Sequence, residues 1–246
     1  MHALSGEDLL IAWEHSRQRS TQEAVLSLLA LASPGQSLSK LARIPLGERN
    51  VLLLELRAGT LGCSMEGSAV CPECGMQLEF ELDPRQLAQG LRQQATVSLE
   101  SIDGVSMRPV NTQDLMACAR ATDENEARSI LLERTVNGQQ AEHGTEEQRA
   151  VPPQDLPSRV TPALIEKFEK LNAAAEIQVQ LQCAGCDARP RLDLDLASYL
   201  LREIAGAARR LMADIHSLAS AYGWSEESIA RMSGARRAVY LEMLNS

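Results

Sequence analysis

The feature that most constrains the fold is a pair of C-x-x-C motifs that lie far apart in the chain. Cys71 and Cys74 stand in VCPECGMQLEFELD, and Cys183 and Cys186 stand in QLQCAGCDARPRLDLDL. In a tight turn each motif directs two sulfurs at one point, and a second such turn completes a tetrahedral metal site. Alternating apolar and polar residues adjoin both pairs, which predicts a β-hairpin at each. We therefore expect the four cysteines to bind one structural zinc ion and the two hairpins to form one zinc ribbon.

The 108 residues between Cys74 and Cys183 exceed the spacing of a local zinc finger. Two separate redox or disulfide pairs are the alternative. A thioredoxin-like site does not fit, because its C-x-x-C opens a helix inside a βαβ unit. Four thiolates fill the coordination shell of zinc and leave no position for a catalytic water, so a structural role is favoured. The lone Cys63 and Cys118 are expected to be buried, as small hydrophobic residues.

Composition limits the class of protein. With 2 Trp, 3 Tyr and 2 Phe among 246 residues, the core must consist mainly of Leu, Ala, Val and Ile, which favours helices. The length allows one large domain or two small ones. A net charge of -9 argues against nucleic acid and against an anionic membrane surface as partners.

The expected location of the chain is the cytoplasm. No apolar run approaches the roughly 20 residues that a membrane-spanning helix needs. The first residues, MHALSGEDLLIAWEH, lack the basic segment of a signal peptide. Thiols stay reduced in the cytoplasm, which favours metal binding over disulfides.

Hydrophobic periodicity predicts a mostly helical α+β fold. Helices are expected at 6–18, 22–32, 47–62, 112–121, 124–135, 161–175, from 197 almost to the end of the chain, and at 233–244. Ser5, Thr21 and Ser225 are the expected N-caps. Strand alternation occurs at 78–82, 177–181 and 192–196, and a small additional hairpin at 96–110 is expected to turn at Asp103-Gly104.

These elements suggest one compact domain closed by the zinc site. Along the chain it divides into an N-terminal helical segment (1–66), the first zinc knuckle with the following helix (67–95), a hairpin with helices (96–136), a flexible loop (137–157), a helix with the second knuckle (158–196), and the C-terminal helices (197–246).

A narrow apolar seam follows the long C-terminal helix. Its residues recur at spacings of three and four, as in a coiled coil: Leu201, Ile204, Ala208, Leu211, Ile215, Leu218 and Tyr222. Packing against the chain's own helices is favoured, and contact with a partner helix is the alternative.

No catalytic constellation is evident in the sequence. His15, His143 and His216 are scattered, and neither a Walker loop nor a G-x-S-x-G or H-E-x-x-H motif is present. The doublets Arg209-Arg210 and Arg236-Arg237 are interpreted as solvated helix faces. We therefore do not expect an enzyme.

The order of these features resembles the T-even phage baseplate hub assembly chaperone family, which also occurs in contractile tails, tail-like bacteriocins and contractile injection systems. The matching stretches are IPLGERNVLLLELRAGTLG (44–62), VCPECGMQLEFELD (70–83), VQLQCAGC (179–186) and DIHSLASAYGWSEESIARMSGARRAVYLEML (214–244). The last stretch is the most specific, and 96–160 carries little of the resemblance. One departure is the second knuckle, CAGCD at 183–187, where the family pattern is C-P-x-C-G.

The resemblance implies a non-enzymatic assembly factor that binds baseplate hub or spike proteins through helical surfaces. The candidate partner-binding residues are Leu211, Ile215, Leu218, Tyr222, Trp224, Arg236, Arg237 and Tyr240. A structural hub subunit retained in the particle is the first alternative. A zinc-ribbon nucleic-acid-binding protein is disfavoured by Glu66, Glu73, Glu79 and Glu81 around the first knuckle. A metalloenzyme is the remaining alternative.

Overall fold

A computed structural model describes residues 1–94, 100–102, 105–136 and 161–244, and within them the chain is mostly helical. The helices are α1 (Gly6–Gln18), α2 (Thr21–Ala32), α3 (Leu38–Ala42), α4 (Leu46–Leu61), α5 (Pro84–Gln94), α6 (Thr112–Cys118), α7 (Glu124–Thr135), α9 (Pro162–Leu171), the 3-10 helix η2 (Ala173–Ala175), α10 (Leu196–Tyr222), α11 (Glu226–Ala230) and α12 (Gly234–Leu244). The strands are β1 (Met65–Val70), β2 (Gln77–Leu82), β3 (Glu100–Ile102), β4 (Val105–Met107), β5 (Gln178–Gln180) and β6 (Arg191–Asp193). They pair as the antiparallel hairpins β1–β2, β3–β4 and β5–β6, so the predicted α+β class is confirmed.

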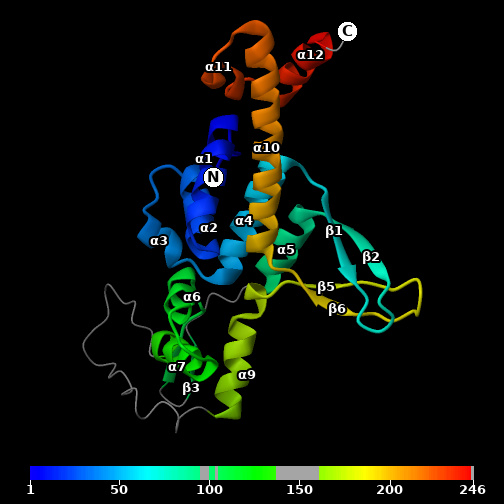
Figure 1. Cartoon of the computed structure of the whole chain (residues 1–246). Helices are drawn as coiled ribbons and strands as arrows, with labels where there is room; N and C mark the ends of the chain where they lie inside the picture. Colours follow the sequence, from blue (N-terminus) through cyan, green and yellow to red (C-terminus); the bar gives the residue numbers. More distant parts are fainter. Residues whose placement is uncertain (95–99, 103–104, 137–160, 245–246) are drawn as a thin grey trace.

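The long helix α10 organises the molecule. It has 27 residues and is therefore about 40 Å long. α1, α2 and α4 pack against it, while α11 and α12 lie at its far end. The two cysteine hairpins lie together on one side, and α6, α7 and α9 lie at the end opposite α11 and α12 (Figure 1).

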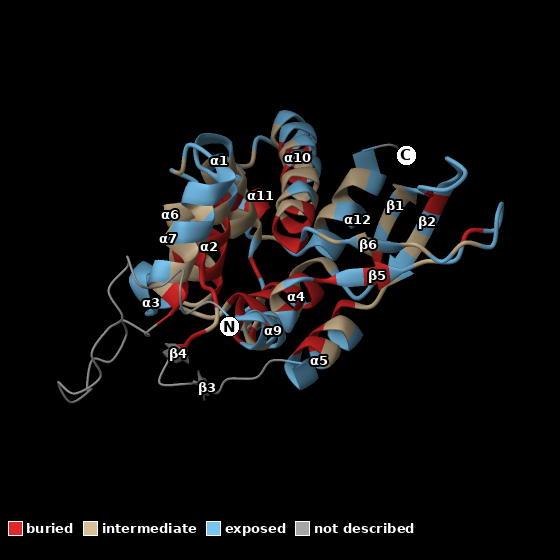
Figure 2. Ribbon diagram, turned by 90° about the horizontal axis from the view of Figure 1, so that it is seen from below, coloured by how far each residue is buried: buried red, intermediate tan, exposed pale blue. Residues whose placement is uncertain are grey.

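The main core lies between α2, α4 and the first half of α10, as the red inner faces in Figure 2 show. Leu28, Leu53 and Leu200 in it have no solvent exposure. Burial of one such leucine contributes about 1.5–3 kcal/mol, so this cluster contributes strongly to the stability of the fold.

Most of the apolar seam of α10 is internal. Ile204 belongs to the main core, whereas Leu211, Ile215 and Leu218 form a second cluster with Ile229 of α11. Only Tyr222, at the end of the seam, is exposed. The favoured prediction that the seam packs against the chain's own helices is therefore confirmed for its buried residues.

Cap chemistry explains where the first helices begin. The Ser5 hydroxyl accepts a hydrogen bond from the Asp8 N–H, as expected for an N-cap. The predicted cap Thr21 is wrong: Ser20 is the N-cap of α2 and forms a capping box with Glu23. A hydroxyl three residues before a glutamate satisfies two helix-terminal donors, which places the boundary one residue earlier than predicted. Ser225 caps α11 as predicted.

Other boundaries also differ from the prediction. The short helix α3, which Ser37 caps, is not among the predicted helices. Strand β6 ends at Asp193 rather than 196, because the Asp195 side chain accepts the Ser198 N–H and starts α10. Strands β3 and β4 pair as predicted, with Ile102 opposite Val105. The expected turn at 103–104 and the expected flexible loop at 137–157 lie outside the described residues.

The stretch IPLGERN forms the start of α4 and joins three parts of the fold. Gly47 is required by close packing, since a Cβ there would lie 2.6 Å from the Ala174 Cβ of η2. The Asn50 side chain donates to the Ala175 carbonyl (3.0 Å). Buried Arg49 donates to Gln22 Oε1 (2.7 Å) on α2, and its burial lowers its pKa to about 10. α4 is thereby fixed to both α2 and η2.

A buried ion-pair network fixes the start of α6. Asp114 has no solvent exposure and accepts two hydrogen bonds from Arg108 (2.6 and 2.9 Å) and one from Arg134 Nε (2.8 Å). It also accepts the Asn111 N–H in a capping box. Burial alone would raise the pKa of Asp114, but these hydrogen bonds outweigh it and hold the pKa below its usual value.

We expect Asp114→Asn to lower the free energy of unfolding by about 3 kcal/mol, because it leaves two arginines without their shared carboxylate. Urea unfolding followed by circular dichroism measures this. Glu133→Gln on the exposed face of α7 is the control and should change stability by less than about 0.5 kcal/mol.

The same network predicts a pH dependence. A carboxyl group whose pKa is lowered by folding stabilises the protein above its unfolded pKa of about 3.9, and this contribution is lost as the pH falls through the folded pKa. The stability difference between wild type and Asp114→Asn should therefore be full at neutral pH and shrink below about pH 4. A constant difference across this range would contradict the assignment.

Candidate metal centre

The structure brings the two cysteine pairs into one cluster. The ligand atoms of Cys71, Cys74, Cys183 and Cys186 all lie within 4.8 Å of one another. Two of these contacts join one knuckle to the other: Cys71 Sγ lies 3.7 Å from Cys186 Sγ, and Cys74 Sγ lies 3.5 Å from Cys183 Sγ. Cys71 and Cys183 are buried, whereas Cys74 and Cys186 are exposed.

These distances suit a tetrahedral metal ion. With zinc–sulfur bonds of about 2.3 Å, the sulfurs of a tetrahedral site lie about 3.8 Å apart. The four cysteines can therefore hold one metal ion with small adjustments. Such a shell would be complete, because four protein ligands leave no open position for water or substrate.

The two knuckles share one backbone design despite their different sequences. In the first, the Gly75 N–H donates to the Cys71 carbonyl (2.9 Å), and in the second the Asp187 N–H donates to the Cys183 carbonyl (2.9 Å). Both donor residues have positive φ, 75° at Gly75 and 56° at Asp187. Aspartate tolerates this left-handed conformation better than most residues, so the departure at position 187 preserves the turn.

Gly185 serves a different purpose, because its φ is not positive. A Cβ at Gly185 would lie 2.9 Å from Met76 Sδ of the other knuckle. Met76 Sδ also lies 4.0 Å from Cys183 Sγ. Met76 of the first knuckle therefore packs against Gly185 of the second, where a larger side chain would clash. This contact brings the two turns together beside the four sulfurs.

Electrostatics favours a cation at the cluster. Hydrogen bonds from the Gly185 and Cys186 N–H groups lower the pKa of Cys183 to about 7, although burial opposes this. The Ala188 N–H lowers the pKa of Cys186, but the neighbouring Cys74, Cys183 and Cys71 sulfurs outweigh it and raise that pKa to about 12. Sulfurs this close cannot all be thiolates without a positive ion among them.

Two contacts attach the first hairpin to the helical body. The Tyr199 hydroxyl on α10 donates to the Glu66 carbonyl on β1 (2.8 Å). Buried Arg57 on α4 pairs with Glu203 of α10 (2.7 Å) and donates to the Gly62 carbonyl just before β1 (2.6 Å). No sequence motif marks Arg57, Tyr199 or Glu203 as contacts of the hairpin; the one available signal is an arginine within a leucine-rich helix.

The predicted partner-binding residues fall into two groups. Leu211, Ile215 and Leu218 are buried in this structure, so they present no surface to a partner. The others surround the turn from α10 into α11 and α12. Tyr222 stacks on Trp224 (ring centroids 4.6 Å apart), and Tyr240 meets Trp224 edge-on (4.9 Å).

The stretch Tyr222-Gly223-Trp224-Ser225 is thus a helix corner. Gly223 takes the left-handed conformation (φ 70°) that ends α10, and Ser225 caps α11. Arg237 is held inside this corner by the Met232 carbonyl (2.5 Å) and by Asp214 (3.3 Å). Arg236 stays exposed and lies over the Tyr240 ring at 5.7 Å.

The remaining candidate residues are separate from the cluster. Cys63 is exposed, so the expectation of burial is wrong; it follows Gly62 in the bend between α4 and β1. Cys118 is half-buried, and its burial raises its pKa. His216 is exposed on α10, and His143 lies outside the described residues.

Residues 5–189 match the model of a protein family described as T4 bacteriophage base plate protein. The chain belongs to this baseplate family. Its matched segment contains both cysteine pairs and the helices between them, and it ends before α10. The recognition of a baseplate protein from its sequence is therefore confirmed at the family level.

Neither the curated proteins nor the solved structures gave a match to the chain. Among the described helices, none has both the length and the apolar character that a bilayer span requires.

We expect about one zinc ion per chain by elemental analysis of the purified protein. Cys74→Ser and Cys183→Ser should each abolish stoichiometric binding and lower the melting temperature of the whole chain, because metal affinity contributes to folding free energy. Acid should release the ion, since the ligands must be thiolates.

Cys63→Ser and Cys118→Ser are matched controls, because neither cysteine belongs to the cluster. Both should retain the metal. Retention of a full ion after loss of either C-x-x-C pair would contradict a shared site.

Proposed function

We propose that this chain is a non-enzymatic assembly factor, or chaperone, for the baseplate hub or spike of a phage-like contractile tail or injection system. Membership of the baseplate family supports a role in the baseplate. The proposal extends this to transient binding of hub or spike proteins during assembly in the bacterial cytoplasm. The metal centre is proposed to hold structural zinc and to take no part in chemistry, because its four thiolates complete the coordination shell.

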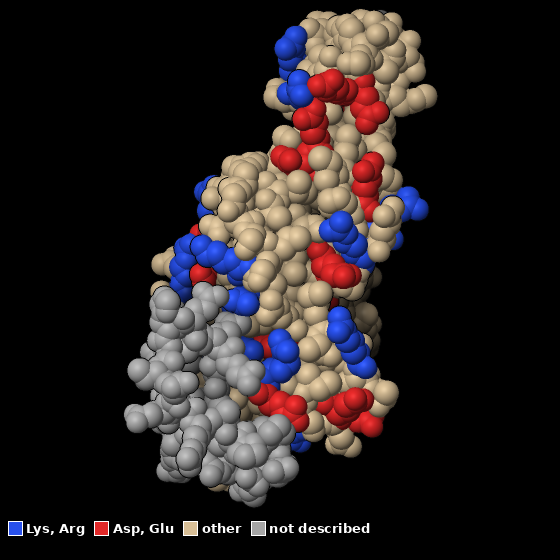
Figure 3. Space-filling model, turned by 90° about the vertical axis from the view of Figure 1, so that its left-hand side faces the viewer, with Lys and Arg blue, Asp and Glu red and all other residues tan. Residues whose placement is uncertain are grey.

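The observation that carries this proposal is an exposed apolar ridge at the tip of the molecule. Helix α12 has no buried residue, and Val239 and Met243, one turn apart, are 49% and 61% exposed. Leu244, next to Met243 in the chain, and Tyr222, at the end of α10, are also exposed. Figure 3 shows the other side of the tip, on which α11 lies, and there charges of both signs are interspersed below a largely uncharged top.

An apolar helix ridge of this kind is typical of a surface that receives a partner helix or groove. The aromatic corner of Tyr222, Trp224 and Tyr240 holds α12 at the end of α10. The ridge is therefore presented rigidly, well away from the metal centre (Figure 1). We infer that the tip binds the client and that the body positions it.

A retained structural subunit of the hub is the second candidate, because the family description is that of a base plate protein. Mass spectrometry of purified particles separates the two functions. An assembly factor should be absent from finished particles, while deletion of its gene should prevent baseplate assembly. Stoichiometric presence in the particle would favour the subunit instead.

Charged substitutions test the tip directly. We expect Val239→Asp with Met243→Asp to weaken co-purification of tagged chain with co-expressed hub and spike proteins by at least about tenfold, since both side chains would lose their apolar contacts. Ile165→Asp, on another exposed apolar residue, is the matched control and should bind normally. Equal binding of the hub and spike proteins by the wild type, the double variant and Ile165→Asp would exclude the tip as the client surface.

A further inference from the structure

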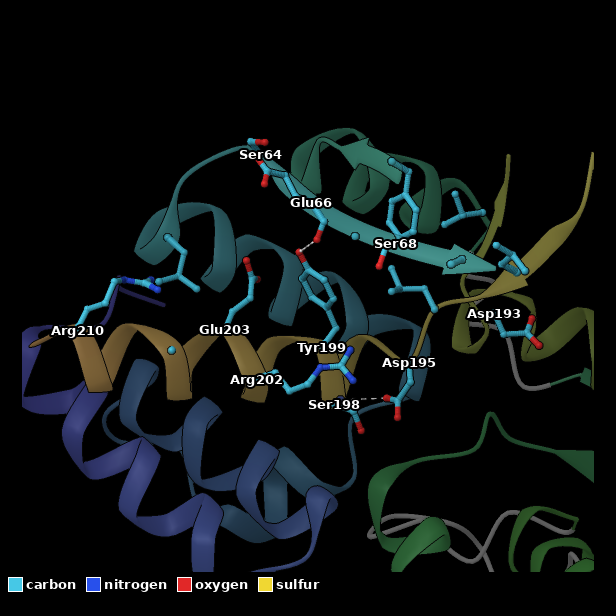
Figure 4. Close-up of a pocket in the computed structure, with 18 residues that line it drawn as sticks. Ser64, Glu66, Ser68, Asp193, Asp195, Ser198, Tyr199, Arg202, Glu203 and Arg210 are labelled. Atoms are coloured by element: carbon cyan, nitrogen blue, oxygen red, sulfur yellow. Dashed lines mark hydrogen bonds between the residues drawn. The ribbon is translucent and has the colours of Figure 1, made fainter. Parts of the chain in front are cut away.

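A cleft of about 1070 Å³ lies between the first hairpin and α10, apart from both the metal centre and the tip. One wall is β1 with Phe80 of β2, and the other is α10 from Ser198 to Arg210. Leu192, Asp193 and Leu194 lie at one end. Figure 4 shows β1 running alongside α10, so the space is an elongated groove.

Strand β1 offers unpaired main-chain groups to this groove. The Cys71 N–H donates to the Met76 carbonyl (2.8 Å), so in the same register Ala69↔Leu78 and Gly67↔Phe80 are the hydrogen-bonded pairs of the hairpin. The main-chain groups of the alternate residues Glu66 and Ser68 therefore point away from β2.

Only part of this edge is occupied. The Glu66 carbonyl accepts the Tyr199 hydroxyl across the groove (Figure 4). Among the described strands, β1 pairs with β2 alone. The Ser68 N–H and carbonyl are thus an open strand edge inside the groove, of the kind to which an extended peptide can add.

The α10 wall carries two arginines that are free to bind an anion. Arg202 and Arg210 are exposed, line the groove, and form no ion pair with any described residue. They are eight residues apart, so they lie about 12 Å apart along the helix axis and about 80° apart around it, and both line the groove. Gly206, which lies between them and also lines the groove, has no side chain to fill the space.

Most of the acidic groups that line the groove already have partners. Glu203 is paired with Arg57 (2.7 Å), the Asp195 side chain accepts the Ser198 N–H (3.1 Å), and Asp193 accepts from Gln178 (3.1 Å). By strand alternation the Glu66 side chain projects to the face opposite Phe80. Hydrogen bonds to neutral donors leave Asp193 and Asp195 charged at one end of the groove. Along α10 from Ser198 to Arg210, the groove-lining charges without an ion-pair partner among the described residues are Arg202 and Arg210.

We propose that this groove binds an extended acidic segment of a partner protein, which adds as a strand to β1 and pairs two carboxylates with Arg202 and Arg210. Residues four apart in an extended chain lie on one side about 13 Å from each other, which matches the spacing of the two arginines. Arginine–carboxylate hydrogen bonds are among the strongest in proteins and fix register as well as affinity. This site is distinct from the tip and does not depend on the proposed assembly role.

The test uses the full-length chain and a short fluorescent peptide of alternating Thr and Val with Glu at two positions four residues apart. Binding is measured by fluorescence anisotropy. We expect the double variant Arg202→Glu with Arg210→Glu to bind at least about tenfold more weakly, a loss of about 1.4 kcal/mol. Arg209→Glu is the matched control: it is exposed on the same helix, does not line the groove, and should bind within about twofold of wild type.

Two further peptides probe charge and strand addition without altering the protein. A peptide with Lys in place of Glu should not bind, and methylation of alternate peptide amides should abolish binding of the acidic peptide. Equal binding of the Lys and Glu peptides, unchanged affinity after amide methylation, or no binding of the acidic peptide with a Kd below about 1 mM would overturn the proposal.

Discussion

The closure of a long loop by four sulfur atoms is the constraint on which the rest of the structure depends. Two short hairpins, separated by 108 residues between Cys74 and Cys183, meet through contacts between their turns. Their strands form separate sheets, so no ladder of hydrogen bonds joins one hairpin to the other among the described strands. The buried cluster around Cys71 and Cys183 is also small. Without a shared ion, little else would hold the two turns in register.

The position of this closure explains the shape of the molecule. The first hairpin follows α4 directly, and the second leads directly into α10. Joining the hairpins therefore fixes the end of α4 beside the start of α10, where Arg57 and Glu203 form their ion pair. From this fixed start α10 extends past the main core and carries α11 and α12 at its far end (Figure 1). The cysteine cluster can in this way determine where the tip formed by α11 and α12 is held.

Features with a local cause were predictable from the sequence. The helices from 6–18 to 233–244 follow from apolar periodicity, and the turns of both knuckles follow from C-x-x-C spacing. Ser20 was missed as a cap because Thr21 beside it is also a good cap residue, and only the partner at Glu23 decides between them. Position 187 could be recognised as unusual, but its left-handed conformation emerges only from the structure.

Features that depend on distant residues could not be predicted in the same way. The contacts Arg57–Glu203 and Tyr199–Glu66 join residues 146 and 133 positions apart. Periodicity identified the seam of α10 but not its neighbours, so Leu211, Ile215 and Leu218 were placed among the partner-binding residues although α11 and α12 cover them. The exposed ridge of Val239 and Met243 becomes visible only once the fold shows which face of α12 is left uncovered.

X-ray absorption at the zinc edge of the purified chain tests the proposed closure most directly, because it reports the ligands around the metal. We expect four sulfur neighbours at about 2.3 Å and no nitrogen or oxygen ligand. A spectrum with fewer sulfurs and a bound water or histidine, or a chain that contains no zinc and keeps the two knuckles apart, would contradict a structural ion held by all four cysteines.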